Sequence, residues 1–189
     1  MNTLVRTSNT MDPSANAVGI AIFAELTRHP QNSLHLVYQV PHFIRSLVNA
    51  ASSTNVECRK YACFAFQNLA CESGCRQELA TTPGLLSALD RCLVQEVQET
   101  EQLSALLTMK SISEDPSNFI HLSNTHGCIQ TLIRLANKDD NSRAQYEAAD
   151  ILATLSHWMI ASATAAMKFQ EDEVLHVPVI RVEGWNQFQ

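Results

Sequence analysis

The stretch ECRKYACFAFQNLA at residues 57–70 carries the pattern that decides the fold. Its residues Ala62, Ala65, Phe66 and Leu69 follow the spacing i, i+3, i+4, i+7, which one face of an α-helix buries. The same pattern returns in other segments, each 43 residues from the next. The final positions of these segments are Leu26, Leu69, Ile112 and Leu155. Such equal spacings indicate an internal repeat.

Two shorter helical elements repeat together with the long one. The middle element carries an apolar pair, which is Ile44/Leu47, Leu86/Leu89 and Ile129/Leu132 in turn. The short element carries one apolar residue, which is Leu36, Leu79 and Leu122 in turn. Proline or glycine precedes each middle helix, at Pro41, Pro83–Gly84 and Gly127. Glycine suits a sharp turn there because it tolerates positive φ.

Each predicted unit therefore contains a short, a middle and a long helix. A period of about 40–47 residues with two or three helices is the signature of HEAT and armadillo arrays. One unit cannot bury its apolar face alone, so neighbouring units stack around a continuous core. The sequence predicts an all-α fold, a right-handed α-solenoid.

A family resemblance makes this prediction more specific. Residues 57–70 resemble the third helix of an armadillo repeat, a family that favours a charged start, small core residues and an Asn-Leu-Ala ending. Residues 83–89 and 127–133 resemble its second helix. The resemblance covers residues 15–157 and implies a solenoid of the ARM/HEAT type.

The armadillo register divides the chain into three parts. We expect a disordered segment at residues 1–14, a repeat domain at 15–157 and a non-repeat tail at 158–189. Within the domain, a leading third helix at 15–28 precedes the repeats. The expected repeats are residues 31–71, 74–114 and 117–157.

The pattern stops after residue 157. The positions 43 residues beyond Gly127 and Ile129 are Gln170 and Asp172, which suit neither a turn glycine nor a core residue. Residues 174–182 alternate weakly, as a strand does. Two readings stay open: the chain is part of a longer array, or residues 158–160 fold back over the last repeat.

The resemblance implies that the third helices line a concave groove in which partners lie as extended peptides. In nuclear-import adaptors of the importin-α kind, these helices repeat a Trp and an Asn four residues apart. The Asn holds the peptide backbone, and the Trp forms slots for Lys and Arg. The matching pairs here are Ala21/Glu25, Phe64/Asn68, Leu107/Ser111 and Asp150/Thr154. One aromatic residue cannot build repeated slots, which disfavours a receptor for nuclear-localisation signals.

Lys60, Phe64 and Asn68 share one helix face and form the centre of the predicted contact surface. The matching positions on the later helices complete this surface. They are Leu107, Ser111, Asp150 and Thr154. The alternative is that Phe64 packs against a neighbouring helix and Asn68 caps a backbone group, because solenoid helices are buried on two sides.

Charge and hydropathy exclude several partners. The net charge is −6, with 13 basic and 19 acidic residues and no basic run, so we expect no nucleic-acid partner. The apolar stretch at 15–24 is shorter than the roughly 20 residues of a membrane span. Residues 1–14 contain no apolar core of a signal peptide. We therefore expect no membrane span, and a cytoplasmic or nuclear location.

Cysteine and histidine spacing does not predict a reactive or metal-binding site. Cys71 and Cys75 have the spacing of one half of a structural zinc site, but no second pair of ligands has a fitting spacing. Cys63, Cys92 and Cys128 fall on positions where a small apolar residue is expected. No hydrolase, phosphate-loop or metalloprotease motif is present. We expect no catalytic residue, metal or cofactor.

These observations favour a non-catalytic scaffold that holds a protein or an extended peptide in the groove. Two alternatives are an adaptor in nuclear transport and an adaptor associated with ubiquitin ligases. The weakest alternative is a thiol- or zinc-dependent enzyme, which reactivity at Cys71 and Cys75 would favour.

The register can be tested by the substitution Leu69→Asp. It places an unpaired charge in the predicted stack and should unfold the neighbouring repeats. Circular dichroism during heating measures the loss of helix. Unchanged helicity and an unchanged melting temperature would refute the register.

Overall fold

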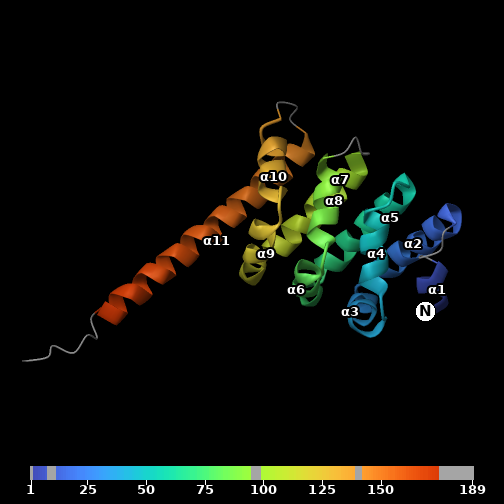
Figure 1. Cartoon of the computed structure of the whole chain (residues 1–189), viewed down its shortest axis with the longest axis horizontal. Helices are drawn as coiled ribbons and strands as arrows, with labels where there is room; N and C mark the ends of the chain where they lie inside the picture. Colours follow the sequence, from blue (N-terminus) through green and yellow to red (C-terminus); the bar gives the residue numbers. More distant parts are fainter. Residues whose placement is uncertain (1, 8–11, 95–98, 139–141, 175–189) are drawn as a thin grey trace, which may run out of the picture.

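The computed structural model describes residues 2–7, 12–94, 99–138 and 142–174, and within them every regular element is helical (Figure 1). A short helix, α1 (Asn2–Thr7), is followed by the long helix α2 (Pro13–Thr27). Helices then recur in the predicted order of short, middle and long. The fold is thus the expected all-α solenoid.

Three sets of helices follow α2. The first set is α3 (Pro30–Gln39), α4 (Phe43–Ala51) and α5 (Val56–Cys71). The second set is α6 (Ser73–Thr81), α7 (Leu85–Val94) and α8 (Glu99–Ser113). The third set is the 3₁₀ turn η1 (Pro116–Asn118) with α9 (Phe119–Asn124), α10 (Cys128–Ala136) and α11 (Arg143–Val174).

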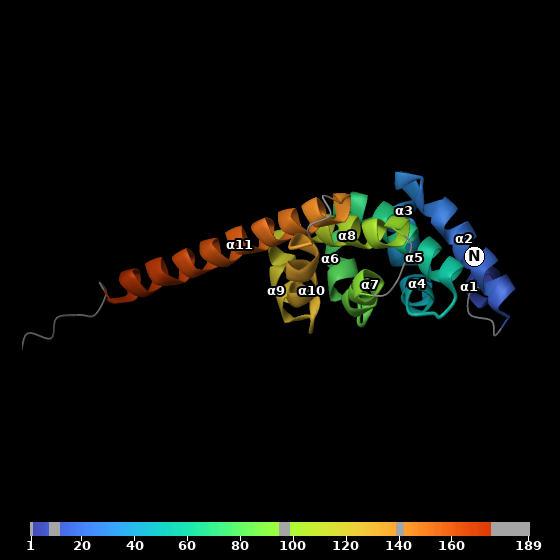
Figure 2. The ribbon, with the colours of Figure 1, turned by 90° about the horizontal axis from the view of Figure 1, so that it is seen from above.

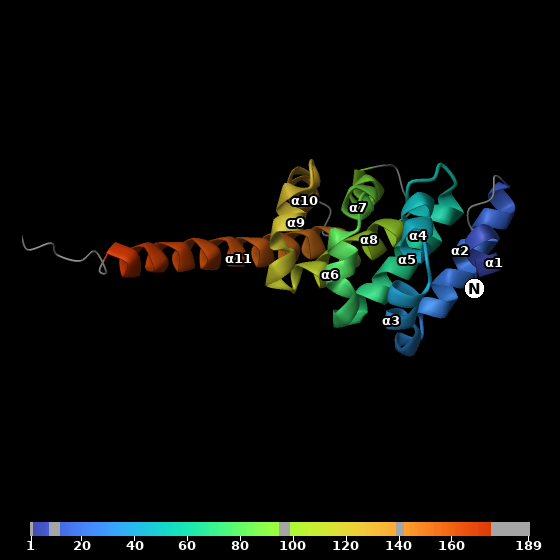
Figure 3. The same cartoon turned by 60° about the horizontal axis from the view of Figure 1, so that its bottom comes forward.

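The long helices stack directly on one another. Helix α5 packs between α2 and α8, and α8 packs between α5 and α11. Figure 2 shows α8 and α11 along one side of the solenoid and α4, α7 and α10 along the opposite side. The middle helices also form a row, in which α7 contacts both α4 and α10 (Figure 3). The sequence repeat therefore becomes a row of long helices backed by a row of middle helices.

The predicted apolar stripes form the core. Leu69 and Ile112 are fully buried, and Leu155 is nearly so. The middle helices contribute Leu47, Leu89 and Leu132, all without exposed surface. Burying a leucine side chain stabilises a fold by roughly 1.5–3 kcal/mol. The stack of these stripes is therefore the main source of cohesion.

Side-chain amides close the turn from a long helix to the next short one. Asn32 Nδ2 donates to Leu26 O at 2.9 Å, and Asn118 Nδ2 donates to Ile112 O at 3.1 Å, two repeat lengths later. In the middle unit Cys75 occupies this position, and Arg76 Nε donates instead to Ala70 O at 2.9 Å. These bonds satisfy carbonyls that a helix end leaves without a partner.

The turn before each long helix is also closed by side chains. Asn55 caps α5, accepting from the backbone N–H groups of Glu57 and Cys58 at 2.9 and 3.3 Å. Gln102 Nε2 donates to Leu93 O, and Gln145 Nε2 donates to Ala136 O, both at 3.2 Å. The two glutamines stand one repeat apart and join each long helix to the middle helix before it.

The N-terminal end differs from the expected disordered segment. Residues 2–7 form α1, which packs against α2, and Val5 contacts the hydrophobic core. Residues 1 and 8–11 lie outside the described part of the chain. Ile22, on the predicted core stripe, is 41% exposed. It is exposed because α2 is the first long helix and has a long-helix neighbour on one side only.

The C-terminal end also differs from the expectation of a tail beginning at residue 158. Helix α11 continues without a break to Val174, and its last turns project from the body of the solenoid (Figure 1). The segment 143–174 contains no glycine or proline and is rich in alanine, so nothing interrupts the helix. Residues 158–160 do not fold back, since Met159 and Ile160 are 56% and 63% exposed. The strand-like residues 175–182 lie outside the described part.

No helix among the described residues is long and apolar enough to cross a bilayer.

One turn in the solenoid is strained. Gly84 and Gly127 precede middle helices with φ of +80° and +84°, as the sequence predicts. The equivalent residue before α4 is His42, which adopts φ of +63°. A residue with a Cβ is less stable in this left-handed conformation than glycine is, by roughly 1–2 kcal/mol.

His42→Gly should therefore stabilise the protein by about 1 kcal/mol, which corresponds to a rise in melting temperature of about 2–4 °C. The reverse change, Gly127→Ala, should lower the melting temperature by a similar amount. Differential scanning calorimetry measures both. A lower melting temperature for His42→Gly would mean that contacts of the imidazole outweigh the backbone strain.

Candidate partner-binding surface

The residues predicted to bind a partner lie on three consecutive long helices. Helix α5 carries Lys60, Phe64 and Asn68, and α8 and α11 carry the matching positions. Because these helices stack in order, the predicted side chains occupy equivalent positions on neighbouring helices. Their surroundings differ from helix to helix.

A cavity of about 340 Å³ lies between α2 and α5. Tyr61, Phe64, Gln67 and Asn68 line it from α5. Ala24 and Glu25 line it from α2, and Arg28 lines it from the position just after this helix. The cavity therefore combines two aromatic rings with amide groups and a pair of opposite charges. Arg28 and Glu25 face one another at 3.6 Å, and both side chains are largely exposed.

Asn68 spans the two helices that form the cavity. Its Nδ2 lies 3.2 Å from Thr27 Oγ1 and 3.4 Å from Ala24 O, both on α2. Thr27 is buried and donates its own hydroxyl proton to Ala24 O at 2.8 Å. Asn68 therefore has the structural role that the alternative reading gave it. Its amide nitrogen is occupied, so the atom it can offer a partner is the amide oxygen.

Phe64 and Lys60 also have contacts within the chain. Phe64 is half-buried against the core while it lines the cavity. Lys60 Nζ pairs with Glu57 Oε2 at 2.6 Å and lies 4.8 Å from the centre of the Tyr61 ring. The hydrogen bond with Glu57 raises the pKa of Lys60, which keeps the ammonium charged. Lys60 does not line the cavity.

An ion pair occupies the corresponding surface between α8 and α11. Lys110 Nζ lies 2.7 Å from Asp150 Oδ2 and 2.8 Å from Glu147 Oε2. The hydrogen bonds to Asp150 first, and then to Glu147, raise the pKa of Lys110. Asp150, a predicted contact residue, thus already has a partner on α8. Thr154 donates its hydroxyl proton to Asp150 O at 3.0 Å, within its own helix.

Leu107 and Ser111 on α8 are half-buried. Neither lines the α2–α5 cavity. The predicted surface is therefore uneven, with an aromatic cavity at its start and a network of charges near its end.

The cavity contains residues that the sequence did not single out. Tyr61 and Gln67 lie three positions before and after Phe64, so their helical spacing could have identified them. Arg28 comes from another helix, and its place beside Phe64 depends on how α2 stacks on α5. The role of Lys110 also depends on helix stacking, because its acidic partners Glu147 and Asp150 lie on α11.

Comparison with known proteins gives structural matches only. No family model matches the chain, and no curated protein matches it. A designed armadillo repeat protein, YIII(Dq)4CqI, superimposes with a TM-score of 0.69 at 21% identity, covering 80% of this chain and 63% of that one. A second designed armadillo repeat protein, in complex with the peptide (KR)4, has a TM-score of 0.70 at 19% identity, covering 84% and 68%.

The fold is that of an armadillo repeat protein. An engineered protein with a TM-score of 0.67 and 20% identity agrees with this, over 81% of this chain and 61% of that one. The chain spans about two thirds of the length of these structures. The low identity means that the likeness concerns the architecture, so the binding chemistry has to be argued from this chain's own residues.

Cys71 and Cys75 have different surroundings in this armadillo fold. Cys71 is exposed and Cys75 is buried. Burial, and then the negative charge of Glu72, raise the pKa of Cys75 to about 11. The Cys75 thiol is therefore neutral at pH 7, when a nucleophile would have to be a thiolate.

The structural role of Asn68 predicts a stability effect. Asn68→Ala removes the bond between α5 and α2 and should cost about 1 kcal/mol, lowering the melting temperature by about 2–4 °C. Ser111→Ala is the matched control, because Ser111 occupies the same repeat position on α8. Equal melting temperatures for the two variants would contradict the role of Asn68 as a bridge.

Proposed function

We propose that this protein is a non-catalytic scaffold that binds an extended segment of a partner protein along α2, α5, α8 and α11. The cavity between α2 and α5 carries the proposal. There the aromatic and amide side chains of α5 face Ala24, Glu25 and Arg28 at the C-terminal end of α2. Aromatic side chains in a concave site are the usual anchors of protein–protein binding.

The chemistry of the cavity indicates the kind of segment that would bind. Tyr61 and Phe64 offer apolar surface for one large side chain. Gln67 and the amide oxygen of Asn68 can bond to the backbone of an extended peptide. Glu25 and Arg28 lie at the same cavity with opposite charges. A segment with an apolar anchor and flanking polar residues fits this surface.

The designed armadillo repeat protein in complex with the peptide (KR)4 supports a peptide as the kind of ligand. A uniformly basic ligand does not follow for this chain. Glu147 and Asp150 are already paired with Lys110, and Phe64 with Asn68 is the one aromatic–amide pair among the matched positions. Roles in nuclear transport or beside a ubiquitin ligase remain predictions for which the cavity offers no specific support.

The proposal can be tested with the double variant Tyr61→Ala/Phe64→Ala. Peptides selected from a random display library against the wild type would be measured by fluorescence polarisation, and partners in a cell lysate identified by pull-down and mass spectrometry. Removing two aromatic anchors should weaken binding by at least about 30-fold, the loss expected at a hot spot. Circular dichroism would first establish that the variant is folded.

Ile133→Ala is the control, because Ile133 is a 46% exposed apolar residue on the middle helix α10. It should bind as the wild type does. Equal binding by the double variant would place the partner on another surface and contradict the proposal.

A further inference from the structure

Three potential metal ligands meet in the core, away from the candidate binding surface. They are Cys63 on α5, Cys92 on α7 and Glu101 on α8. Their ligand atoms all lie within 4.8 Å of one another, and none of the side chains has exposed surface. The group combines one helix of the first repeat, α5, with two helices of the second, α7 and α8. Among the described residues no other such group of three is found.

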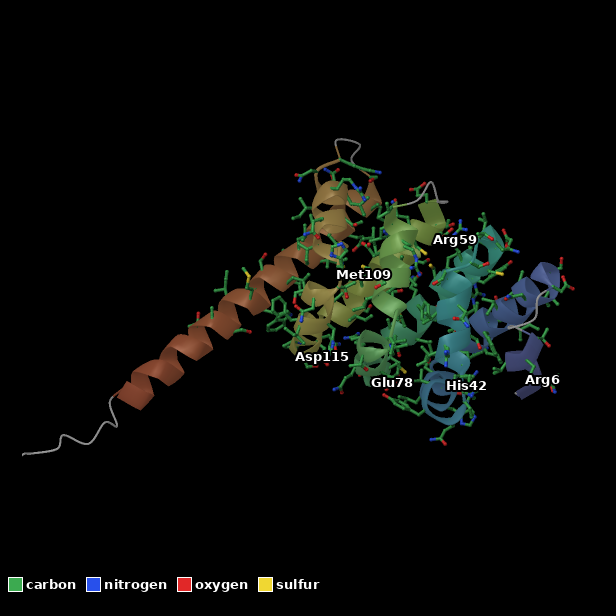
Figure 4. All side chains as sticks on the ribbon, viewed as in Figure 1. Arg6, His42, Arg59, Glu78, Met109 and Asp115 are labelled. Atoms are coloured by element: carbon green, nitrogen blue, oxygen red, sulfur yellow. The ribbon has the colours of Figure 1, made fainter. Side chains whose placement is uncertain are left out.

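Glu101 has one carboxylate oxygen with no partner. Arg59 Nε donates to Glu101 Oε1 at 2.8 Å, where α5 meets α8 (Figure 4). Arg59 Nη1 is held by the carbonyls of Ser53 and Thr54 at 3.1 and 3.0 Å. Glu101 Oε2 is buried without a hydrogen bond. A buried carboxylate oxygen without a partner is costly, so such an atom in a core calls for a ligand.

The two sulfurs are spaced for a metal. Cys63 Sγ and Cys92 Sγ lie 3.6 Å apart. Two Zn–S bonds of about 2.3 Å at a tetrahedral angle place their sulfurs about 3.8 Å apart. Cys92 Sγ lies 3.7 Å from Ala51 O, so a backbone carbonyl is also close to the group.

Without a cation, the Cys63 thiol donates its hydrogen bond to Cys92 Sγ. A bound divalent metal ion would replace the thiol proton as the positive partner of the sulfur, because metals bind thiolates.

We propose that Cys63, Cys92 and Glu101 bind a thiophilic divalent cation such as Zn²⁺ and that the site ties α5, α7 and α8 together. The metal forms two bonds to sulfur and one to Glu101 Oε2, and each thiol releases one proton to solvent. Two thiolates and one carboxylate then balance the charges of the dication and Arg59. For this cluster the proposal differs from the expectation of no metal, which was drawn from cysteine spacing.

The burial of the site determines how it must be loaded. Because none of the ligands is exposed, a metal ion enters while the chain folds or opens locally, and uptake by the folded protein is slow. The full chain is therefore unfolded in guanidinium under reducing conditions and refolded with one equivalent of Co²⁺, whose bonds to thiolate absorb in the near ultraviolet.

The wild type should retain Co²⁺ after gel filtration and show the thiolate-to-cobalt absorption. Refolding with an excess of Zn²⁺ beside the Co²⁺ should prevent this absorption. The variant Cys63→Ala/Cys92→Ala should show no such absorption. The control Cys75→Ala/Cys128→Ala removes two other buried thiols and should behave as the wild type. Glu101→Gln should weaken Co²⁺ binding by at least about tenfold, as loss of a ligand does.

Thermal melting provides a readout that does not depend on the spectrum. Zn²⁺ present during refolding should raise the melting temperature of the wild type and of the control, but not of Cys63→Ala/Cys92→Ala, whatever the stability of each metal-free variant. Absorption of equal strength in Cys63→Ala/Cys92→Ala would overturn the proposal. So would a wild type that takes up no Co²⁺, or a Cys63–Cys92 disulfide formed in its place.

Discussion

Burial of one apolar stripe by successive long helices is the constraint on which the rest of the structure depends. Leu69 on α5 and Ile112 on α8 occupy the same repeat position and are both fully buried. Each stripe needs the neighbouring helix to exclude water, so no single repeat is stable alone. The consequence appears at the N-terminal end, where Ile22 lies on the same stripe of α2 and stays 41% exposed.

Polar side chains adapt this stack to irregularities in the repeat. Asn32 and Asn118 close equivalent turns with the same bond, and Arg76 does so where cysteine replaces asparagine. His42 takes the place of a glycine and holds a left-handed turn. Such substitutions are tolerated because the turn only has to satisfy its carbonyls and redirect the chain, while the core provides most of the stability.

The same side chains that hold the long helices together also shape the candidate binding surface. Asn68 bonds α5 to α2 while it lines the cavity, and Phe64 packs on the core while it forms a wall. Binding and stability therefore share residues at this site. The proposed metal cluster acts at a different place, beneath the surface, where Arg59 and Glu101 already join α5 to α8. A partner segment and a metal ion could then be bound independently.

The 43-residue spacing by itself determined the all-α solenoid, the order of short, middle and long helices, and the turn glycines Gly84 and Gly127. These features follow from local periodicity and backbone preferences, which a sequence displays directly. The four-residue spacing of Phe64 and Asn68 likewise placed both on one helix face. Only the tertiary structure showed that Asn68 bonds to α2, that Lys110 holds Asp150, and that α11 continues past residue 157.

The cluster of Cys63, Cys92 and Glu101 was likewise hidden from the sequence. Its residues come from three helices, and their spacing along the chain matches no metal-binding motif. Contacts between helices depend on stacking distances and on the direction in which each side chain points. A repeat pattern fixes which residues are equivalent, but packing alone decides which atoms meet.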